Sequence, residues 1–169
     1  MNFNRNEALK NLSTIPEWDI VIIGGGATGL GTALDAASRG YKTLLIEKYD
    51  FAKGTSSKST KLVHGGVRYL ANGDIKLVLS ALKERGLIFK NAPHVSFVQS
   101  FVIPSYSIFN KLKFLIGLKL YDWMAGKLRI GKSTLLSKET VIEKLPKIKT
   151  KGLIGGVQYY DGQFDDARL

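Results

Sequence analysis

The chain has 169 residues and a formal net charge of +11, from 25 basic and 14 acidic side chains. Its hydrophobic share of 44% and charged share of 23% exclude a wholly disordered chain and a collagen-like one. It has no cysteine and two histidines, His64 and His94, which excludes a disulfide framework, a zinc ribbon and a thiolate-held iron–sulfur cluster. We therefore expect a globular chain of one domain, with or without an extension, and no metal site.

No targeting or membrane-spanning segment is evident. Residues 1–18 are polar and lack the apolar core of a signal peptide. A spanning helix needs about 20 mostly apolar residues, and no such run occurs. We expect residues 1–18 to be an N-terminal extension of a cytoplasmic protein.

Residues 19–47 predict a strand–helix–strand unit. Residues 19–23 form an apolar, β-branched run typical of a buried strand in a parallel sheet, and residues 42–46 form a second one. Between them, apolar residues recur at helical spacing until Gly40, a typical helix stop. The span of 29 residues is close to the ~30 residues of a dinucleotide-binding βαβ unit.

The turn after the first strand has the spacing G-x-G-x-x-G at Gly24, Gly26 and Gly29. In a dinucleotide-binding unit the first glycine allows a tight turn, the second lets a pyrophosphate approach the backbone, and the third lets the helix pack closely on the strand. The helix N-terminus adds unpaired N–H groups and the positive end of its dipole. Glu47, at the end of the second strand, can accept hydrogen bonds from ribose hydroxyls. An ordinary glycine-rich turn would explain the glycines but not Glu47, so we predict a dinucleotide site.

Glu47 also bears on which dinucleotide binds. A carboxylate at this place suits a free ribose 2′-hydroxyl and repels a 2′-phosphate, which disfavours NADP. NAD and FAD both remain open on the motif alone.

The next informative segment is residues 54–70. Its first half is rich in hydroxyls and carries two lysines, and its second half contains His64, a Gly-Gly pair, Arg68 and Tyr69. One interpretation is a solvated loop followed by a buried turn with a hydrogen-bonded histidine. The other is a site for a planar cofactor and an anionic ligand, because glycines permit close approach and arginine can clamp a phosphate.

Positive charge gathers in residues 111–151, which hold eleven basic and three acidic residues. Within this region residues 107–126 predict a helix whose broad apolar face includes Leu112, Leu115, Ile116, Trp123 and Met124. Core packing explains such a face. Contact with an anionic membrane surface is the second interpretation, because lysines flank the apolar residues. Nucleic-acid binding has no matching motif, so we expect no nucleic-acid partner.

Most of the chain after Trp18 resembles the FAD-dependent glycerol-3-phosphate dehydrogenases, within the D-amino-acid-oxidase-like flavoproteins. The matching text begins D-I-V-I-I-G-G-G-A-T-G-L-G and continues through G-T-S-S-K-S-T-K-L-V-H-G-G-V-R-Y-L to Y-Y-D-G-Q-F-D-D-A-R-L. Ala33 and Gly40 occupy the two further positions of the flavoprotein glycine fingerprint. Lys58 stands where many family members have arginine.

The resemblance implies an enzyme that oxidises sn-glycerol 3-phosphate to dihydroxyacetone phosphate by hydride transfer from C2 to N5 of FAD, with a quinone as the electron acceptor. It implies that Gly24, Gly26 and Gly29 hold the FAD pyrophosphate and Glu47 the ribose. It places five more residues along the flavin: Thr55, Ser56, Ser59, Lys61 and His64. Arg68 and Tyr69 would face the substrate phosphate. A quinone partner implies peripheral attachment to the cytoplasmic face of the inner membrane.

Family members are much longer than this chain, and Asp165 and Asp166 look like the N-cap and first turn of a helix. We therefore interpret the chain as an N-terminal fragment that by itself binds FAD poorly and is inactive, with the catalytic residues in the missing C-terminal part. The expected fold is α/β: an extension over residues 1–18, the first part of a Rossmann-like FAD-binding domain over 19–97, and the start of a mixed α+β substrate-binding region over 98–169.

Four alternatives remain. An oxidase acting on glycerol 3-phosphate would reduce oxygen, and another D-amino-acid-oxidase-like oxidoreductase would take a different substrate. An NAD-dependent dehydrogenase would share only the βαβ unit. A non-catalytic flavin-binding module at a membrane surface would share the motifs without the reaction.

Overall fold

The computed structural model describes residues 4–169 and divides them into two compact units. The first contains residues 4–59 together with 166–168, and the second contains residues 60–165 together with Leu169. The boundary that we expected between residues 97 and 98 lies inside strand β4, Ser96–Ser105. The packing units therefore divide elsewhere, and the assignment of residues 19–97 to one cofactor domain stays a prediction.

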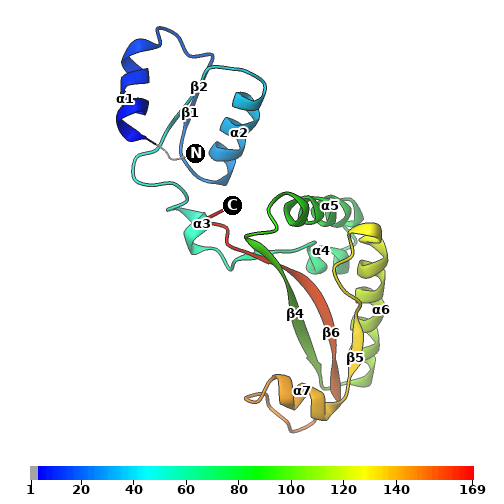
Figure 1. Ribbon diagram of the computed structural model, residues 1–169. Coiled ribbons are helices and arrows are strands. Elements are labelled where there is room, and N and C mark those ends of the chain that lie inside the picture. The colour runs from blue at the N-terminus through cyan, green and yellow to red at the C-terminus, as the bar shows by residue number, and fades with distance from the viewer. Residues whose placement is uncertain (1–3) are drawn as a thin grey trace. The chain divides into compact units, whose positions relative to one another are not determined.

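The first unit contains the predicted strand–helix–strand arrangement (Figure 1). Strands β1, Ile20–Ile23, and β2, Thr43–Ile46, pair in parallel with Ile20 opposite Thr43, and helix α2, Ala27–Ser38, connects them. Helix α1, Arg5–Thr14, precedes them and is capped by Asn4, whose side chain accepts hydrogen bonds from the amides of Asn6 and Glu7. The four-residue helix α3, Thr55–Lys58, closes the unit.

The expectation that these two strands are buried is wrong for the described residues. Ile23 is 88% exposed, and Val21 and Ile46 are exposed as well. Within residues 4–169 the sheet of this unit has two strands, which α2 connects.

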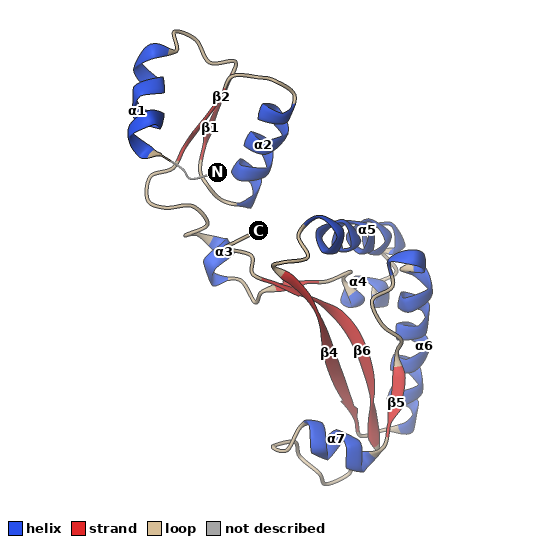
Figure 2. Ribbon diagram, in the orientation of Figure 1, coloured by secondary structure: helices blue, strands red, loops and turns tan. Residues whose placement is uncertain are grey.

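The second unit is built on an antiparallel sheet in which strand β6, Gly155–Phe164, is central (Figure 2). Its long partner is β4, from Ser96 opposite Phe164 to Ser105 opposite Gly155. The short strands β3, Leu62–Val63, and β5, Thr134–Leu136, also pair with β6. The helical elements of this unit are α4, Val67–Ala71; α5, Ile75–Asn91; α6, Ile108–Met124; η1, Gly126–Leu128; and α7, Lys138–Lys144.

The core of the second unit lies between α5 and α6. Val78 and Leu82 from α5 meet Tyr121 and Ala125, and all four are at least 93% buried. The predicted helix over residues 107–126 is confirmed, but α6 buries a different set of residues from the one that we expected: Leu118, Tyr121 and Asp122. Apolar residues lie all round this helix, so periodicity could not select the buried side.

Several aromatic and aliphatic residues of α6 remain exposed, with Phe109 at 82% and Trp123 at 77%. Among the described residues, no helix combines the length and the apolar character that a membrane crossing requires.

Candidate functional site

The glycine turn after β1 has the close packing that its spacing predicts. Gly24 has a φ of +109°, which favours glycine, and its amide donates to the carbonyl of Ile46 over 2.8 Å. A Cβ added to Gly29 would overlap the carbonyl oxygen of Gly24, so the start of α2 lies directly against the turn. A Cβ added to Gly26 would meet nothing within 4 Å. The turn is therefore tight on the strand side and open at the helix N-cap, Gly26.

Glu47 is tied to this turn by two backbone amides. The amide of Gly25 donates to Oε2 over 2.7 Å, and the amide of Tyr49 donates to Oε1 over 2.8 Å. These bonds, the one from Gly25 first, lower the pKa of the Glu47 carboxyl below its ordinary value. The carboxylate is thus held ionised beside the glycines, with lone pairs left on both oxygens for further donors.

A pocket of about 620 Å³ opens at this turn, and we call it the glycine pocket. It is lined by ten residues of the first unit: Gly24, Gly25, Gly26, Glu47, Tyr49, Asp50, Lys53, Gly54, Ser57 and Lys58. The open space at Gly26, the N-terminus of α2 and the two lysines suit an anionic diphosphate, and Glu47 suits hydroxyl groups. The residues present therefore fit the pyrophosphate and ribose of a dinucleotide.

None of the predicted flavin residues after Gly54, all of which the structure describes, lines this pocket. Thr55 is the first residue of α3, Ser56 is the buried residue of this helix, and the Ser59 hydroxyl donates to the carboxylate of Asp166. Their neighbours Ser57 and Lys58 line the pocket instead. Sequence reasoning treated residues 54–61 as a loop and so could not say which side of a helical turn faces inward.

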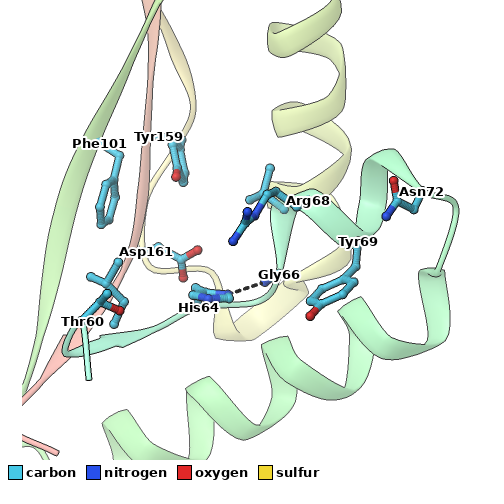
Figure 3. A pocket seen from close by; sticks show the side chains of 11 residues that line it. Thr60, His64, Gly66, Arg68, Tyr69, Asn72, Phe101, Tyr159 and Asp161 are labelled. Atoms are coloured by element: carbon cyan, nitrogen blue, oxygen red, sulfur yellow. Dashed lines mark hydrogen bonds between the residues drawn. The ribbon is translucent and has the colours of Figure 1, made fainter. Parts of the chain in front are cut away.

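A second pocket, of about 640 Å³, lies on the sheet of the second unit (Figure 3), and we call it the sheet pocket. It brings together three predicted residues: His64, Arg68 and Tyr69. Figure 3 shows the Arg68 guanidinium, the His64 ring and the Asp161 carboxylate directed toward the same space. Arg68 is the one lysine or arginine in its lining within residues 4–169, and the other lining residues are Thr60, Leu62, Gly66, Val67, Asn72, Phe101 and Tyr159.

The turn between β3 and α4 places His64 in the sheet pocket. Gly66 has a φ of +75°, and its amide donates to Nδ1 of His64 over 3.1 Å. Because Nδ1 accepts this hydrogen bond, the neutral ring carries its own hydrogen on Nε2 and can donate it. Lys61, which we placed along the flavin, belongs to this unit, and its carbonyl accepts a bond from the amide of Phe164 over 3.0 Å.

The other wall of the sheet pocket consists of residues that our sequence reasoning did not assign. Phe101 and Tyr159 stack with ring centroids 5.3 Å apart across β4 and β6. Burial, followed by the charge of Asp161, raises the pKa of the Tyr159 hydroxyl. Asp161 is itself buried at the base of the pocket. The run from Tyr159 to Leu169 was one of the matching segments, and that match was the available signal.

No group of three or more potential metal ligands from histidine, cysteine, aspartate and glutamate occurs within the described residues.

Comparison with known proteins places the chain in a family. The model of the FAD dependent oxidoreductase family matches residues 19–169. The chain is 46% identical to the mitochondrial glycerol-3-phosphate dehydrogenase of Saccharomyces cerevisiae, over 98% of the chain and 27% of that protein. It is also 46% identical to the aerobic glycerol-3-phosphate dehydrogenase of Staphylococcus haemolyticus, over 98% of the chain and 30% of that protein.

Among solved structures, the glycerol-3-phosphate dehydrogenase of Bacillus halodurans, determined with FAD, superposes with a TM-score of 0.64 at 34% identity, over 97% of the chain and 25% of that protein. The L-alpha-glycerophosphate oxidase of Mycoplasma pneumoniae superposes with a TM-score of 0.61 at 18% identity, over 89% of the chain and 39% of that protein, and shares the fold. The chain spans about a quarter to a third of the length of the curated relatives named above. With the family model covering nearly all of it, the chain belongs to the FAD dependent oxidoreductases and has their α/β, Rossmann-like cofactor-binding fold.

Proposed function

We propose that the chain is the N-terminal part of an enzyme that oxidises sn-glycerol 3-phosphate to dihydroxyacetone phosphate and passes the electrons to a quinone. The observation that carries this proposal is 43–49% identity to eight relatives named glycerol-3-phosphate dehydrogenase, over 95–98% of the chain. In the whole enzyme, residues 19–97 begin the FAD-binding domain and residues 98–169 belong to the substrate-binding region.

The glycine pocket is the part that holds FAD. Gly26 leaves the backbone open to the pyrophosphate, Gly24 and Gly29 keep the turn against the strand, and Glu47 accepts from the ribose hydroxyls. Thr55, Ser56, Ser59, Lys61 and His64 lie along the flavin in this proposal. FAD, when bound, supplies the acceptor for the hydride that leaves C2 of the substrate.

The sheet pocket is the part that binds the substrate. Arg68 binds the phosphate group, because a guanidinium can donate two parallel hydrogen bonds to it. Tyr69, from the same helix α4, contacts the substrate beside it. His64 offers its Nε2 hydrogen to an oxygen atom in the same space. The base that removes the proton from the C2 hydroxyl lies outside this chain in our proposal.

The quinone acceptor implies a position at the cytoplasmic face of the inner membrane. Exposed Phe109 and Trp123 on α6, with Lys113 and Lys119 on the same helix, support a peripheral contact with an anionic lipid surface.

The test uses the full-length protein that contains this chain, kept without oxygen. We expect a flavin absorbance band that bleaches when glycerol 3-phosphate is added and recovers when a soluble quinone is added. A bleached band that recovers faster with oxygen, with stoichiometric peroxide, would make the protein an oxidase. A flavin band that glycerol 3-phosphate does not bleach would contradict the proposed substrate, and a colourless protein refolded with FAD would contradict the whole proposal.

A further inference from the structure

Behind the sheet pocket lies a buried hydrogen-bonded cluster formed by Arg85, Tyr121 and Asp161, from α5, α6 and β6. Each of these residues is at most 2% exposed. Nη1 of Arg85 donates to Oδ1 of Asp161 over 2.8 Å, and the Tyr121 hydroxyl donates to Oδ2 of the same carboxylate, also over 2.8 Å. The guanidinium carbon lies 5.7 Å from the centre of the Tyr121 ring.

The Tyr121 hydroxyl uses all of its hydrogen-bonding capacity. It donates its one proton to Asp161 and accepts from the amide of Gly65 over 2.7 Å and from Nη1 of Arg85 over 3.4 Å. Burial, followed by the charge of Asp161, raises the pKa of this hydroxyl, so it keeps its proton throughout the ordinary pH range. Three partners, from α5, β6 and the turn between β3 and α4, therefore fix the position of the oxygen.

Gly65 connects this cluster to the turn between β3 and α4, which holds residues that line the sheet pocket. A Cβ added to Gly65 would overlap both the Tyr121 hydroxyl and the side chain of Leu82. The turn thus lies directly on the cluster at this residue. The amide of the next residue, Gly66, donates to His64, and Gly66 is the N-cap of α4, which carries Arg68.

We infer that Tyr121 is a positioning residue: its hydroxyl, oriented by Asp161 and Arg85, fixes the Gly65 amide and with it the place of His64 and Arg68 in the sheet pocket. A buried ion pair generally contributes little net stability over an apolar replacement. This cluster ends on the backbone amide of Gly65, in a turn that forms part of the sheet pocket. The position that it imposes on this turn explains the cluster better than a contribution to stability does. The consequence for the substrate rests on the proposed function.

The first experiment compares Tyr121→Phe with the unchanged full-length protein. The matched control is Tyr106→Phe, which removes a hydroxyl that donates to the carbonyl of Lys149 over 2.8 Å in the same unit, outside the sheet pocket. By hydrogen exchange, we expect the peptide containing Gly65 to exchange faster in Tyr121→Phe and not in Tyr106→Phe. Equal exchange in the two variants would overturn the inference.

The second measurement separates position from general stability. We expect Tyr121→Phe to retain FAD, and its kcat/KM for glycerol 3-phosphate to fall by about 10- to 100-fold, mainly through a higher KM, because displaced binding groups lose alignment with the substrate. Loss of FAD in parallel with activity would indicate a merely structural role and overturn the inference. If the unchanged protein is not bleached by glycerol 3-phosphate, the proposed function fails, and the exchange comparison still decides whether Tyr121 fixes the turn.

Where Tyr121→Phe does not fold, Gly65→Ala tests the same contact from its other side. Its new Cβ displaces the turn from the hydroxyl, so we expect faster exchange of the same peptide and a raised KM with FAD retained. Unchanged exchange and KM in a folded Gly65→Ala protein would contradict the inference.

Discussion

The amide of Gly25 and the carboxylate of Glu47, 22 residues apart in the chain, are joined by a hydrogen bond of 2.7 Å. The bond connects the end of β1 with the end of β2, so the group that we expect to bind ribose also holds the glycine turn. These two roles of Glu47, binding the ribose and holding the turn, can be tested by removing the charge of its carboxylate and by titrating it.

Glu47→Gln should weaken FAD binding, because a neutral amide has one acceptor oxygen where the carboxylate has two. The flavin-to-protein ratio of the purified full-length protein measures this. Glu143→Gln, on the exposed surface of α7, is the control and should retain the flavin of the unchanged protein. Equal flavin content in both variants would show that Glu47 is not a cofactor residue.

The titration of Glu47 follows from its lowered pKa. Because the folded pKa lies below the unfolded value of about 4.3, its contribution to stability is fully present above that pH and is lost as the pH falls through the folded pKa. We expect the side-chain carboxyl carbon of Glu47 in labelled protein to titrate, by NMR, below the ordinary glutamate value. A midpoint at or above the ordinary glutamate value would contradict the two amide bonds.

Gly29→Ala should disrupt the glycine turn, because its Cβ would overlap the Gly24 carbonyl, and backbone cannot move aside as a flexible side chain can. Overpacking of this kind costs about 1–3 kcal/mol, and we expect flavin content to fall with it. Gly31→Ala is the matched control on the same helix, where the new Cβ meets nothing within 4 Å. That variant should be stabilised by up to about 1 kcal/mol, because alanine favours helix more than glycine does. Equal free energies of unfolding for Gly29→Ala and Gly31→Ala, measured by denaturant unfolding, would contradict the close contact at Gly29.

Leu82→Ala should lower the free energy of unfolding by about 2–5 kcal/mol, because it empties part of the cluster formed with Val78 and Tyr121. Leu79→Ala lies on the same helix with its side chain 46% exposed and should change stability by much less. Denaturant unfolding of both full-length variants provides the comparison. A small effect at Leu82 would mean that the core lies elsewhere.

Arg68→Met should raise the KM for glycerol 3-phosphate by about 10- to 100-fold, because a hydrogen bond to a charged group contributes about 1.5–3 kcal/mol. Flavin content should not change, since Arg68 does not line the glycine pocket. Lys76→Met, which removes an exposed cation at the start of α5, is the control. Steady-state kinetics measure the KM of both variants. A KM that rises equally in both would show that Arg68 does not bind the substrate phosphate.

The sequence was most informative where a local pattern determines the structure. The βαβ unit was predictable because strand, turn, helix and strand follow one another within residues 19–47, and the structure has β1, α2 and β2 there. The spacing at Gly29 predicted close packing of the helix on the strand, and a Cβ added there would overlap the Gly24 carbonyl oxygen.

The sheet pocket depended on long-range pairing and was less predictable. Arg85 and Asp161 are 76 residues apart, and their contact depends on the packing of α5 and on the sheet that positions β6. No local sequence pattern specifies how β6 pairs with its neighbouring strands. For the same reason the exposed residues of α6 could not be told from its buried ones before the elements packing against it were known.

The central place of β6 has a consequence for biosynthesis. Its three partners, β3, β4 and β5, all precede it in the chain and so emerge from the ribosome first. Until residues 155–164 are made, those strands have no common neighbour, and Arg85 has no counter-charge. Pairing of these three strands with β6 therefore waits until β6 is translated, a delay during which chaperones can bind the unpaired edges.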